Sequence, residues 1–147
     1  MPEIPGSVLA FSTFFELARA SDLLSVRLGN CCDNQKLTYS QLGILEALLK
    51  AGPLCQKDLG EKILKSSGNV TLVIDNLEKR KLVQRERKGD DRRVVTIHLT
   101  EDGKRTILEV LPRLALFFQE EMKAITSEEQ NMLSRICKKL TEARKTG

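Results

Sequence analysis

The most informative segment of the chain is residues 66–99, SSGNVTLVIDNLEKRKLVQRERKGDDRRVVTIHL. Apolar residues recur with helical spacing in its first half, at Val70, Val73, Ile74 and Leu77. This spacing predicts an amphipathic helix over residues 66–79. After Leu82 the alternation changes to a period of two, which predicts two strands joined by a polar turn at residues 88–91. A helix followed by a β-hairpin is therefore expected.

The residues before this segment predict three further helices. The sequence TYSQ at residues 38–41 has the form of a capping box, and the Gly-Pro pair at residues 52–53 ends the helix that follows. A short helix is expected over residues 55–64 and a long one over residues 7–29. The middle helices and the hairpin together have roughly the sixty residues of a winged helix-turn-helix unit.

The residues after the hairpin predict two helices. Thr100 can cap a helix that continues to about residue 125, and Pro112 inside it is expected to cause a kink. A second capping sequence at residues 126–129 starts the last helix. The predicted fold is therefore mainly α with a small β-hairpin. Its expected parts are an N-terminal dimerisation helix (residues 1–36), a winged helix-turn-helix region (37–100) and C-terminal dimerisation helices (101–147), all in one compact domain.

The composition is that of an ordinary globular protein, with 41% hydrophobic and 30% charged residues. No apolar run approaches the ~18 residues of a membrane span, and the N-terminus has no readable secretory signal. We therefore expect a cytoplasmic protein with no membrane partner. Residues 78–93 contain eight Lys or Arg and four Asp or Glu, so this stretch carries the whole net charge of +4. Such a local basic excess is expected where a protein approaches phosphate.

The polar residues of this segment have the chemistry of DNA contacts. Amides and hydroxyls can read base edges in the major groove, and an outward Leu72 can touch a thymine methyl group. At the hairpin a guanidinium can enter the narrow minor groove, with Asp91 placed to orient Arg93. An ordinary surface helix and a solvated hairpin are the alternatives. The predicted DNA-binding residues are Ser66, Ser67, Asn69, Thr71, Leu72, Asn76, Lys79, Arg87, Lys88, Asp91, Arg92 and Arg93.

Two runs of sequence resemble the multiple-antibiotic-resistance regulator (MarR) family. They are DNLEKRKLV at residues 75–83 and DRRVVTIHLTEDG at residues 91–103. Asp91 with Arg93, and the Leu-Thr-x-x-Gly at residues 99–103, are the most specific parts of the match. The resemblance covers nearly the whole chain. It implies a transcriptional regulator, expected to be a repressor, that binds a palindromic double-stranded DNA operator as a homodimer. It also implies that the 66–79 helix enters the major groove and Arg93 the minor groove.

Two positions depart from the family pattern. Leu72 stands where relatives commonly carry Arg, so the resemblance does not imply a direct contact with a base or phosphate there. Lys81 stands where Gly is frequent, so the turn into the wing is expected to differ slightly. Neither change removes the predicted fold.

The phenylalanines are confined to two predicted helices outside the DNA-binding region. All five belong to the first and fifth helices, at Phe11, Phe14, Phe15, Phe117 and Phe118. Buried aromatic side chains dominate the energetics of interfaces. A helix of about 24 residues is also ~36 Å long, which is more than a small core can cover. We expect a homodimer interface there, with an intramolecular core as the alternative.

The signal to which the protein responds has several candidates. Members of the MarR family respond to small phenolic ligands, to oxidants or, more rarely, to metals. Cys55 is predicted at a helix start, where the helix dipole would favour its thiolate, and Cys31 and Cys32 lie near the expected pivot between the two parts. These cysteines are candidates for redox sensing, although most free cysteines are small buried fillers.

Other classes of function have little support in the sequence. There is no CxxC pair, and His98 is the only histidine, so no metal site and no cofactor is expected. A Gly-rich phosphate loop and a GxSxG motif are also missing, so the chain is not expected to be an enzyme. The remaining alternatives are a winged-helix module for protein contacts and a thiol-based redox enzyme.

Overall fold

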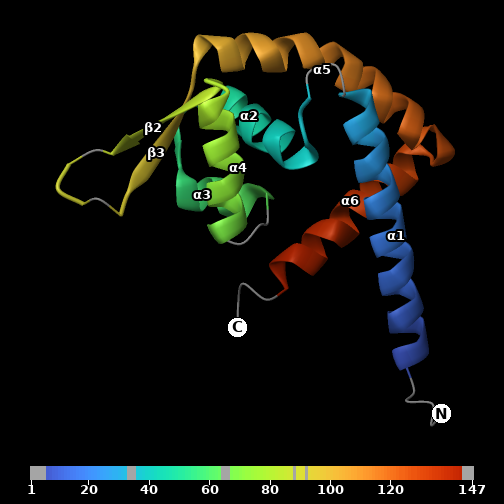
Figure 1. Ribbon diagram of the computed structural model, residues 1–147. Helices are drawn as coiled ribbons and strands as arrows, with labels where there is room; N and C mark the ends of the chain where they lie inside the picture. The colour runs from blue at the N-terminus through green and yellow to red at the C-terminus, as the bar shows by residue number, and fades with distance from the viewer. Residues whose placement is uncertain (1–5, 33–35, 64–66, 88, 92, 144–147) are drawn as a thin grey trace.

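The structure is a computed structural model that describes residues 6–32, 36–63, 67–87, 89–91 and 93–143. The elements in chain order are α1 (Ser7–Cys31), α2 (Tyr39–Ala51), β1 (Leu54–Cys55), α3 (Gln56–Ile63), α4 (Ser67–Lys79), β2 (Val83–Arg87), β3 (Val95–Leu99), α5 (Glu101–Glu121), the 3-10 turn η2 (Met122–Ala124) and α6 (Ser127–Glu142). Figure 1 shows α2, α3, α4 and the β2–β3 hairpin grouped as one body, with α5 above it and α1 extending away. The predicted mainly helical fold with a small hairpin is confirmed.

Capping boxes set the start of two helices, as predicted. At α2 the Gln41 amide donates to Thr38 Oγ1 at 3.2 Å, and the Thr38 amide donates to Gln41 Oε1 at 2.9 Å. At α6 Thr126 and Glu129 form the same reciprocal pair. Each cap satisfies amides that the helix itself leaves without partners, worth typically ~1 kcal/mol. At its other end α2 stops at Gly52, whose φ of 77° is one that glycine adopts readily.

The sheet has one strand more than the predicted hairpin. Its order is β1-β3-β2, and both pairs are antiparallel. The strand β1 pairs Leu54 with Ile97 and Cys55 with Thr96. Cys55, predicted at the start of the third helix, is the last residue of β1 and lies directly before α3, which begins at Gln56. Two residues are too few to show a period, and only pairing with the distant β3 makes them a strand.

The other element boundaries differ from the predictions by a few residues. α1 continues to Cys31, two residues beyond the expected end. α5 ends at Glu121, before the expected residue 125, because the chain tightens into η2 and Ile125 is extended with a φ of −128°. Pro112 lies inside α5, and Figure 1 shows this helix changing direction along its length. No helix among the described residues has both the length and the apolar character needed to cross a membrane.

The hydrophobic core lies where the three middle helices meet the sheet and α5. Its fully buried side chains include Ile44, Leu45, Leu48, Leu59, Ile74, Leu77, Ile97 and Ile107. Burial of one such side chain is worth about 1.5–3 kcal/mol. α1 joins this core only near its C-terminal end, through Leu28 and Cys32. Arg27 of α1 also donates to Glu121 of α5 at 2.8 Å, which holds the two helices together on the surface.

Candidate nucleic-acid interface

The helix α4 separates its side chains into a buried and an exposed face. Val70, Ile74 and Leu77 are at most 1% exposed and pack in the core. The other face is exposed and carries Asn69, Thr71, Leu72, Asn76 and Lys79. This is the face predicted to bind DNA, and Leu72 on it is 60% exposed. Ser67 is the first residue of α4, whereas Ser66 lies outside the described residues.

Thr71 also has contacts inside the protein. Its Oγ1 accepts a hydrogen bond from Gln56 Nε2 at 2.8 Å, and Gln56 is the first residue of α3. Its carbonyl oxygen accepts a hydrogen bond from the Arg85 guanidinium at 3.3 Å. Thr71 therefore helps to fix the angle between α3 and α4, a role that the sequence did not indicate.

The C-terminal end of α4 turns sharply into the hairpin. The Leu82 amide donates to the Leu77 carbonyl at 3.0 Å, and the Lys81 amide donates to the Glu78 carbonyl at 2.9 Å. These two bonds form a Schellman motif, in which the residue after the cap is left-handed and is usually Gly. Lys81 holds that position with a φ of 61°. Lys81 thus adopts the left-handed conformation of this position although glycine is frequent there.

The hairpin projects from the body next to α4 (Figure 1). β2 and β3 pair along their whole length, from Val83 opposite Leu99 to Arg87 opposite Val95. Beyond them, Asp91 Oδ1 accepts hydrogen bonds from the Arg93 amide at 3.0 Å and from Arg93 Nε at 3.2 Å. The expected contact between Asp91 and Arg93 is therefore present. The Arg93 side chain is 93% exposed, so its guanidinium faces solvent.

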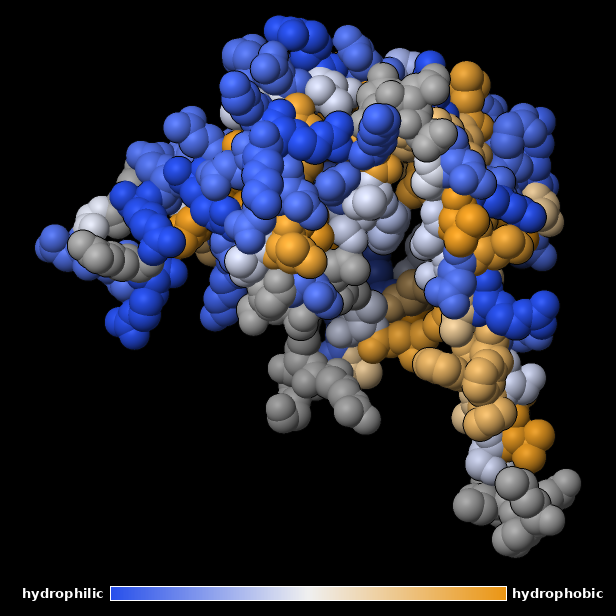
Figure 2. Space-filling view, in the orientation of Figure 1, coloured by the Kyte–Doolittle hydropathy of each residue, from blue (hydrophilic) through white to orange (hydrophobic). Residues whose placement is uncertain are grey.

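The surface of the hairpin is largely hydrophilic (Figure 2). Figure 2 shows hydrophilic side chains covering the hairpin and the adjoining part of the body. Arg87 and Arg93 are exposed there, whereas the predicted contacts Lys88 and Arg92 lie outside the described residues. Farther down the hairpin, His98 Nε2 contacts Glu86 Oε2, and the His98 side chain is 33% exposed. His98 is thus a strand residue that packs within the sheet. No group of three or more His, Cys, Asp or Glu able to hold a metal occurs within the described ranges.

Arg85 connects the hairpin to α4, a connection that the sequence analysis missed. Arg85 Nη1 lies 2.6 Å from Asp75 Oδ1 and 3.1 Å from Glu78 Oε1. The backbone amide of Arg85 donates to Glu78 Oε2 at 2.9 Å. An acidic pair three residues apart on a helix, followed by an arginine on the next strand, is the only sequence signal for this contact.

The base of the hairpin rests on the start of α5. Thr100 caps α5 by accepting from the Gly103 amide at 3.0 Å, and its hydroxyl donates to the Lys81 carbonyl at 2.7 Å. Gly103 approaches Leu82 so closely that an added Cβ would lie 2.0 Å from the Leu82 carbonyl oxygen. The Leu-Thr-x-x-Gly sequence therefore joins three elements, α4, the hairpin and α5, in one fixed arrangement.

This arrangement agrees with what the comparisons with known proteins show. The family described as Transcriptional regulator SarA/Rot matches residues 28–110, more than half of the chain. The chain belongs to this family. It is a winged-helix, MarR-type transcriptional regulator, so the resemblance read from Asp91, Arg93 and residues 99–103 is confirmed.

Individual relatives agree with the family. The transcriptional repressor MdtR of Bacillus subtilis is 32% identical over 114 residues, which are 78% of this chain and 74% of MdtR. The structure of BpsR from Bordetella bronchiseptica is 25% identical, covers 88% of this chain and 98% of BpsR, and has a TM-score of 0.81. A MarR-like regulator from Bacillus cereus, at 22% identity, covers 93% of this chain and 99% of its own, with a TM-score of 0.79, and shares the fold. These proteins are regulators and not enzymes.

The MarR-type regulator leaves much of its first helix uncovered. Phe11, Phe14 and Phe15 are 69%, 63% and 48% exposed. They contact one another, with ring centroids 4.7 Å apart for Phe11 and Phe15. Figure 2 shows hydrophobic side chains gathered on α1, in contrast to the hydrophilic hairpin. Phe118 is also 45% exposed, whereas Phe117 packs against the core. The aromatic residues therefore form mainly a surface and not an intramolecular core.

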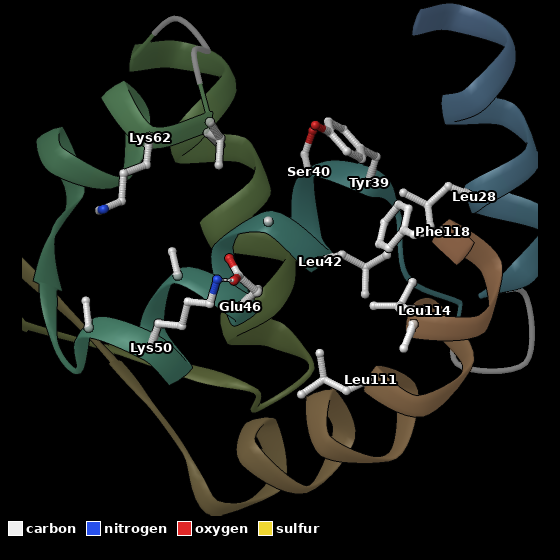
Figure 3. A pocket seen from close by; sticks show the side chains of 15 residues that line it. Leu28, Tyr39, Ser40, Leu42, Glu46, Lys50, Lys62, Leu111, Leu114 and Phe118 are labelled. Carbon is white, nitrogen blue, oxygen red and sulfur yellow. Dashed lines mark ion pairs between the residues drawn. The ribbon is translucent and has the colours of Figure 1, made fainter. Parts of the chain in front are cut away.

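A cavity of about 730 Å³ lies where α1, α2, α3 and α5 of the regulator meet. Figure 3 shows its apolar wall, made of Leu28, Leu42, Leu111, Leu114 and Phe118. Its polar groups come from Tyr39, Ser40, Lys62 and the ion pair between Glu46 and Lys50, whose atoms are 2.6 Å apart. The Glu46 carboxylate raises the pKa of Lys50 above its ordinary value. An apolar cavity with a few polar groups is typical of sites for small organic ligands.

The three candidate cysteines differ in their surroundings. Cys31 and Cys32 lie at the end of α1, and Cys32 is 1% exposed. Burial raises the pKa of the Cys32 thiol above its ordinary value; the adjacent Cys31 adds to this shift and Arg113 opposes it. A buried thiol that stays protonated is a poor nucleophile. Cys55 is half-buried in β1, in a different element from the other two.

Proposed function

We propose that the protein is a homodimeric repressor that binds a palindromic DNA operator and is released from it by a signal. The observation that carries this proposal is the joint position of two surfaces: the exposed polar face of α4 and the basic hairpin belong to one body. α4 would enter the major groove, while Arg93 would reach the minor groove beside it.

The DNA contacts follow from the chemistry of these residues. Asn69 and Asn76 offer amides to base edges, and the exposed Leu72 offers an apolar contact to a thymine methyl group. Ser66, Ser67, Thr71 and Lys79 are further contacts from this helix; Arg87, Lys88, Asp91 and Arg92 complete the wing around Arg93. Eight of these residues are seen to be exposed, which supports the proposal: Asn69, Thr71, Leu72, Asn76, Lys79, Arg87, Asp91 and Arg93.

The dimer would form through α1, α5 and α6. Residues 1–36 and 101–147 would then be the dimerisation parts, and residues 37–100 the DNA-binding part. The exposed phenylalanines of α1 support this, together with Leu133, Ile136 and Leu140, which are exposed on α6. α1 has 25 residues and, at 1.5 Å per residue, is about 37 Å long. A second copy would cover this surface and place two α4 helices about one DNA turn, ~34 Å, apart.

The signal would be a small molecule that occupies the cavity between the dimerisation helices and the winged-helix body. The apolar wall and the few polar groups of the cavity support an organic ligand, and the DNA binding of the related BpsR is regulated by 6-hydroxynicotinic acid. A ligand that fits better when the two α4 helices are wrongly spaced would shift the dimer to that state and weaken DNA binding. Oxidation at Cys31, Cys32 or Cys55 is the second candidate signal; the burial of Cys32 favours the first.

The experiment that tests the function is selection of duplexes from a random-sequence DNA library by the purified full-length protein. We expect an enriched palindrome, a binding unit of two chains by analytical ultracentrifugation, and an affinity that falls steeply with salt as counterions are released from phosphates. Binding to a protein partner with no enrichment of any duplex would instead support a winged-helix module for protein contacts.

A further inference from the structure

Arg85 lies at the junction of the two surfaces that would contact DNA. Its guanidinium bridges Asp75 and Glu78 of α4, its Nη2 donates to the Thr71 carbonyl, and its own backbone belongs to β2. We propose that Arg85 is a positioning residue that sets the orientation of the wing relative to the recognition helix α4. This inference rests on the proposed function, because it assumes that both elements contact one duplex.

The geometry fits this role because the contacts come from several directions. Asp75 and Glu78 are about one turn apart on α4. A single guanidinium placed between them therefore restricts both the rotation of α4 about its own axis and its position along that axis relative to β2. The amide of Arg85 also donates to Glu78, so Glu78 contacts both the backbone and the side chain of the same strand residue. Arginine holds such an arrangement better than lysine, because its donors form a rigid planar fork.

The burial of the group also distinguishes it from an ordinary surface ion pair. The Arg85 side chain is 19% exposed, whereas those of Asp75 and Glu78 are 44% and 41% exposed. Without the Arg85 guanidinium, Asp75 and Glu78 would lose the positive charge between them, close to the surface proposed for DNA, and Glu78 would keep only the bond from the backbone amide of residue 85. Carboxylates there would repel phosphate, so the same guanidinium that orients the wing also offsets part of this negative charge.

A double-mutant cycle between Arg85 and the wing tip tests the proposal. The probe is a duplex that the wild-type protein selects from a random library, compared with an unrelated duplex of equal length and composition. In the wild type, Arg93→Ala is expected to reduce affinity for the selected duplex by about fivefold or more. In an Arg85→Gln background, the same change is expected to reduce it by less than about threefold, because a misplaced wing has no minor-groove contact to lose.

Controls separate positioning from loss of charge or of stability. Arg105→Gln removes the same charge from an exposed arginine whose ion pair with Asp102 lies within α5, and Arg93→Ala should keep its full effect in that background. Affinities are compared at a temperature where circular dichroism shows every variant folded. If Arg85→Gln does not fold, the double variant Asp75→Asn, Glu78→Gln, which removes both partners of the guanidinium, replaces it in the cycle.

The outcomes distinguish this inference from the proposed function. An undiminished effect of Arg93→Ala in the folded Arg85→Gln variant, or in its replacement, overturns the positioning role and leaves DNA binding intact. A diminished effect, together with a full effect in the Arg105→Gln control, supports it. Failure of the wild-type protein to select any duplex overturns the proposed function, and the positioning role with it.

Discussion

Gly103 and Leu82 lie in van der Waals contact at the point where the hairpin meets α5. A Cβ on Gly103 would lie 2.0 Å from the Leu82 carbonyl oxygen and 2.8 Å from Leu99 Cδ1. Backbone cannot yield as a flexible side chain can, so Gly103→Ala must separate α5 from the turn after α4. We expect a loss of roughly 3 kcal/mol in the free energy of unfolding, measured by urea denaturation.

Gly29→Ala is the matched control for this prediction. Gly29 also lies in a helix, but a Cβ there would meet nothing within 4 Å. Alanine is the better helix former, so this change is expected to stabilise the protein by about 0.5–1 kcal/mol. Equal effects of the two substitutions would contradict the close approach at Gly103.

Lys81→Gly should make the protein more stable. Lys81 has a φ of 61°, a left-handed conformation that disfavours any residue with a Cβ. Glycine relieves this cost but adds freedom to the unfolded chain, so the expected net gain is about 0.5–1 kcal/mol. Lys104→Gly, inside α5, is expected to cost a similar amount. Thermal melts of the three proteins at one concentration provide the comparison, and a loss of stability in Lys81→Gly would refute it.

Arg93→Ala should weaken DNA binding without changing stability. The Arg93 side chain is 93% exposed and bonds only locally to Asp91 among the contacts that the structure describes. If its guanidinium reaches a base or phosphate, its removal should cost ~1–3 kcal/mol of binding free energy. Fluorescence anisotropy with the selected duplex measures the affinity, and a melt measures stability. Wild-type affinity in this variant would exclude the wing tip from the interface.

Cys32 should resist alkylation in the folded protein. It is 1% exposed, and its pKa is raised chiefly by burial. The reagent therefore cannot easily reach the thiol, and little of the thiol is in the reactive thiolate form. At pH 8 we expect iodoacetamide to modify Cys31 and Cys55 before Cys32, with peptide mass spectrometry as the readout. Labelling of Cys32 as fast as in urea would show that the site opens readily.

The same pKa shift predicts how stability changes at alkaline pH. The contribution of the neutral Cys32 thiol is fully present below the ordinary thiol pKa of 9.0 and is lost as pH rises through the higher folded pKa. The unfolded chain releases its proton first over this range, so the free energy of unfolding falls. A Cys32→Ala variant should lose that part of the slope between pH 8 and 10. Parallel pH profiles of the two proteins would contradict the shift.

The elements that could be predicted from sequence are those with local signals. The capping boxes at Thr38 and Thr126 and the apolar stripe from Val70 to Leu77 each lie within one element, and all of them appear in the structure. β1 could not be predicted in this way. Leu54 and Cys55 are a strand only because β3, some forty residues later, pairs with them.

In the candidate interface, too, the features with local signals could be predicted from the sequence, whereas the contacts between distant elements could not. The exposed face of α4 and the contact between Asp91 and Arg93 follow from spacing along a few residues. Arg85 appeared in the sequence only as one member of an alternating strand, because its partners on α4 depend on the angle between helix and hairpin. The contacts of Gln56 with Thr71 and of Gly103 with Leu82 likewise depend on how the elements pack.

The uncovered aromatic face of α1 has a consequence for how the protein unfolds. Phe11, Phe14 and Phe15 are exposed, and Phe15 packs on the other two, so the N-terminal half of α1 buries little apolar surface within one chain. If a second copy supplies the missing cover, folding and association become one equilibrium governed by mass action. The melting temperature is then not a constant of the chain, and dilution alone should lower it.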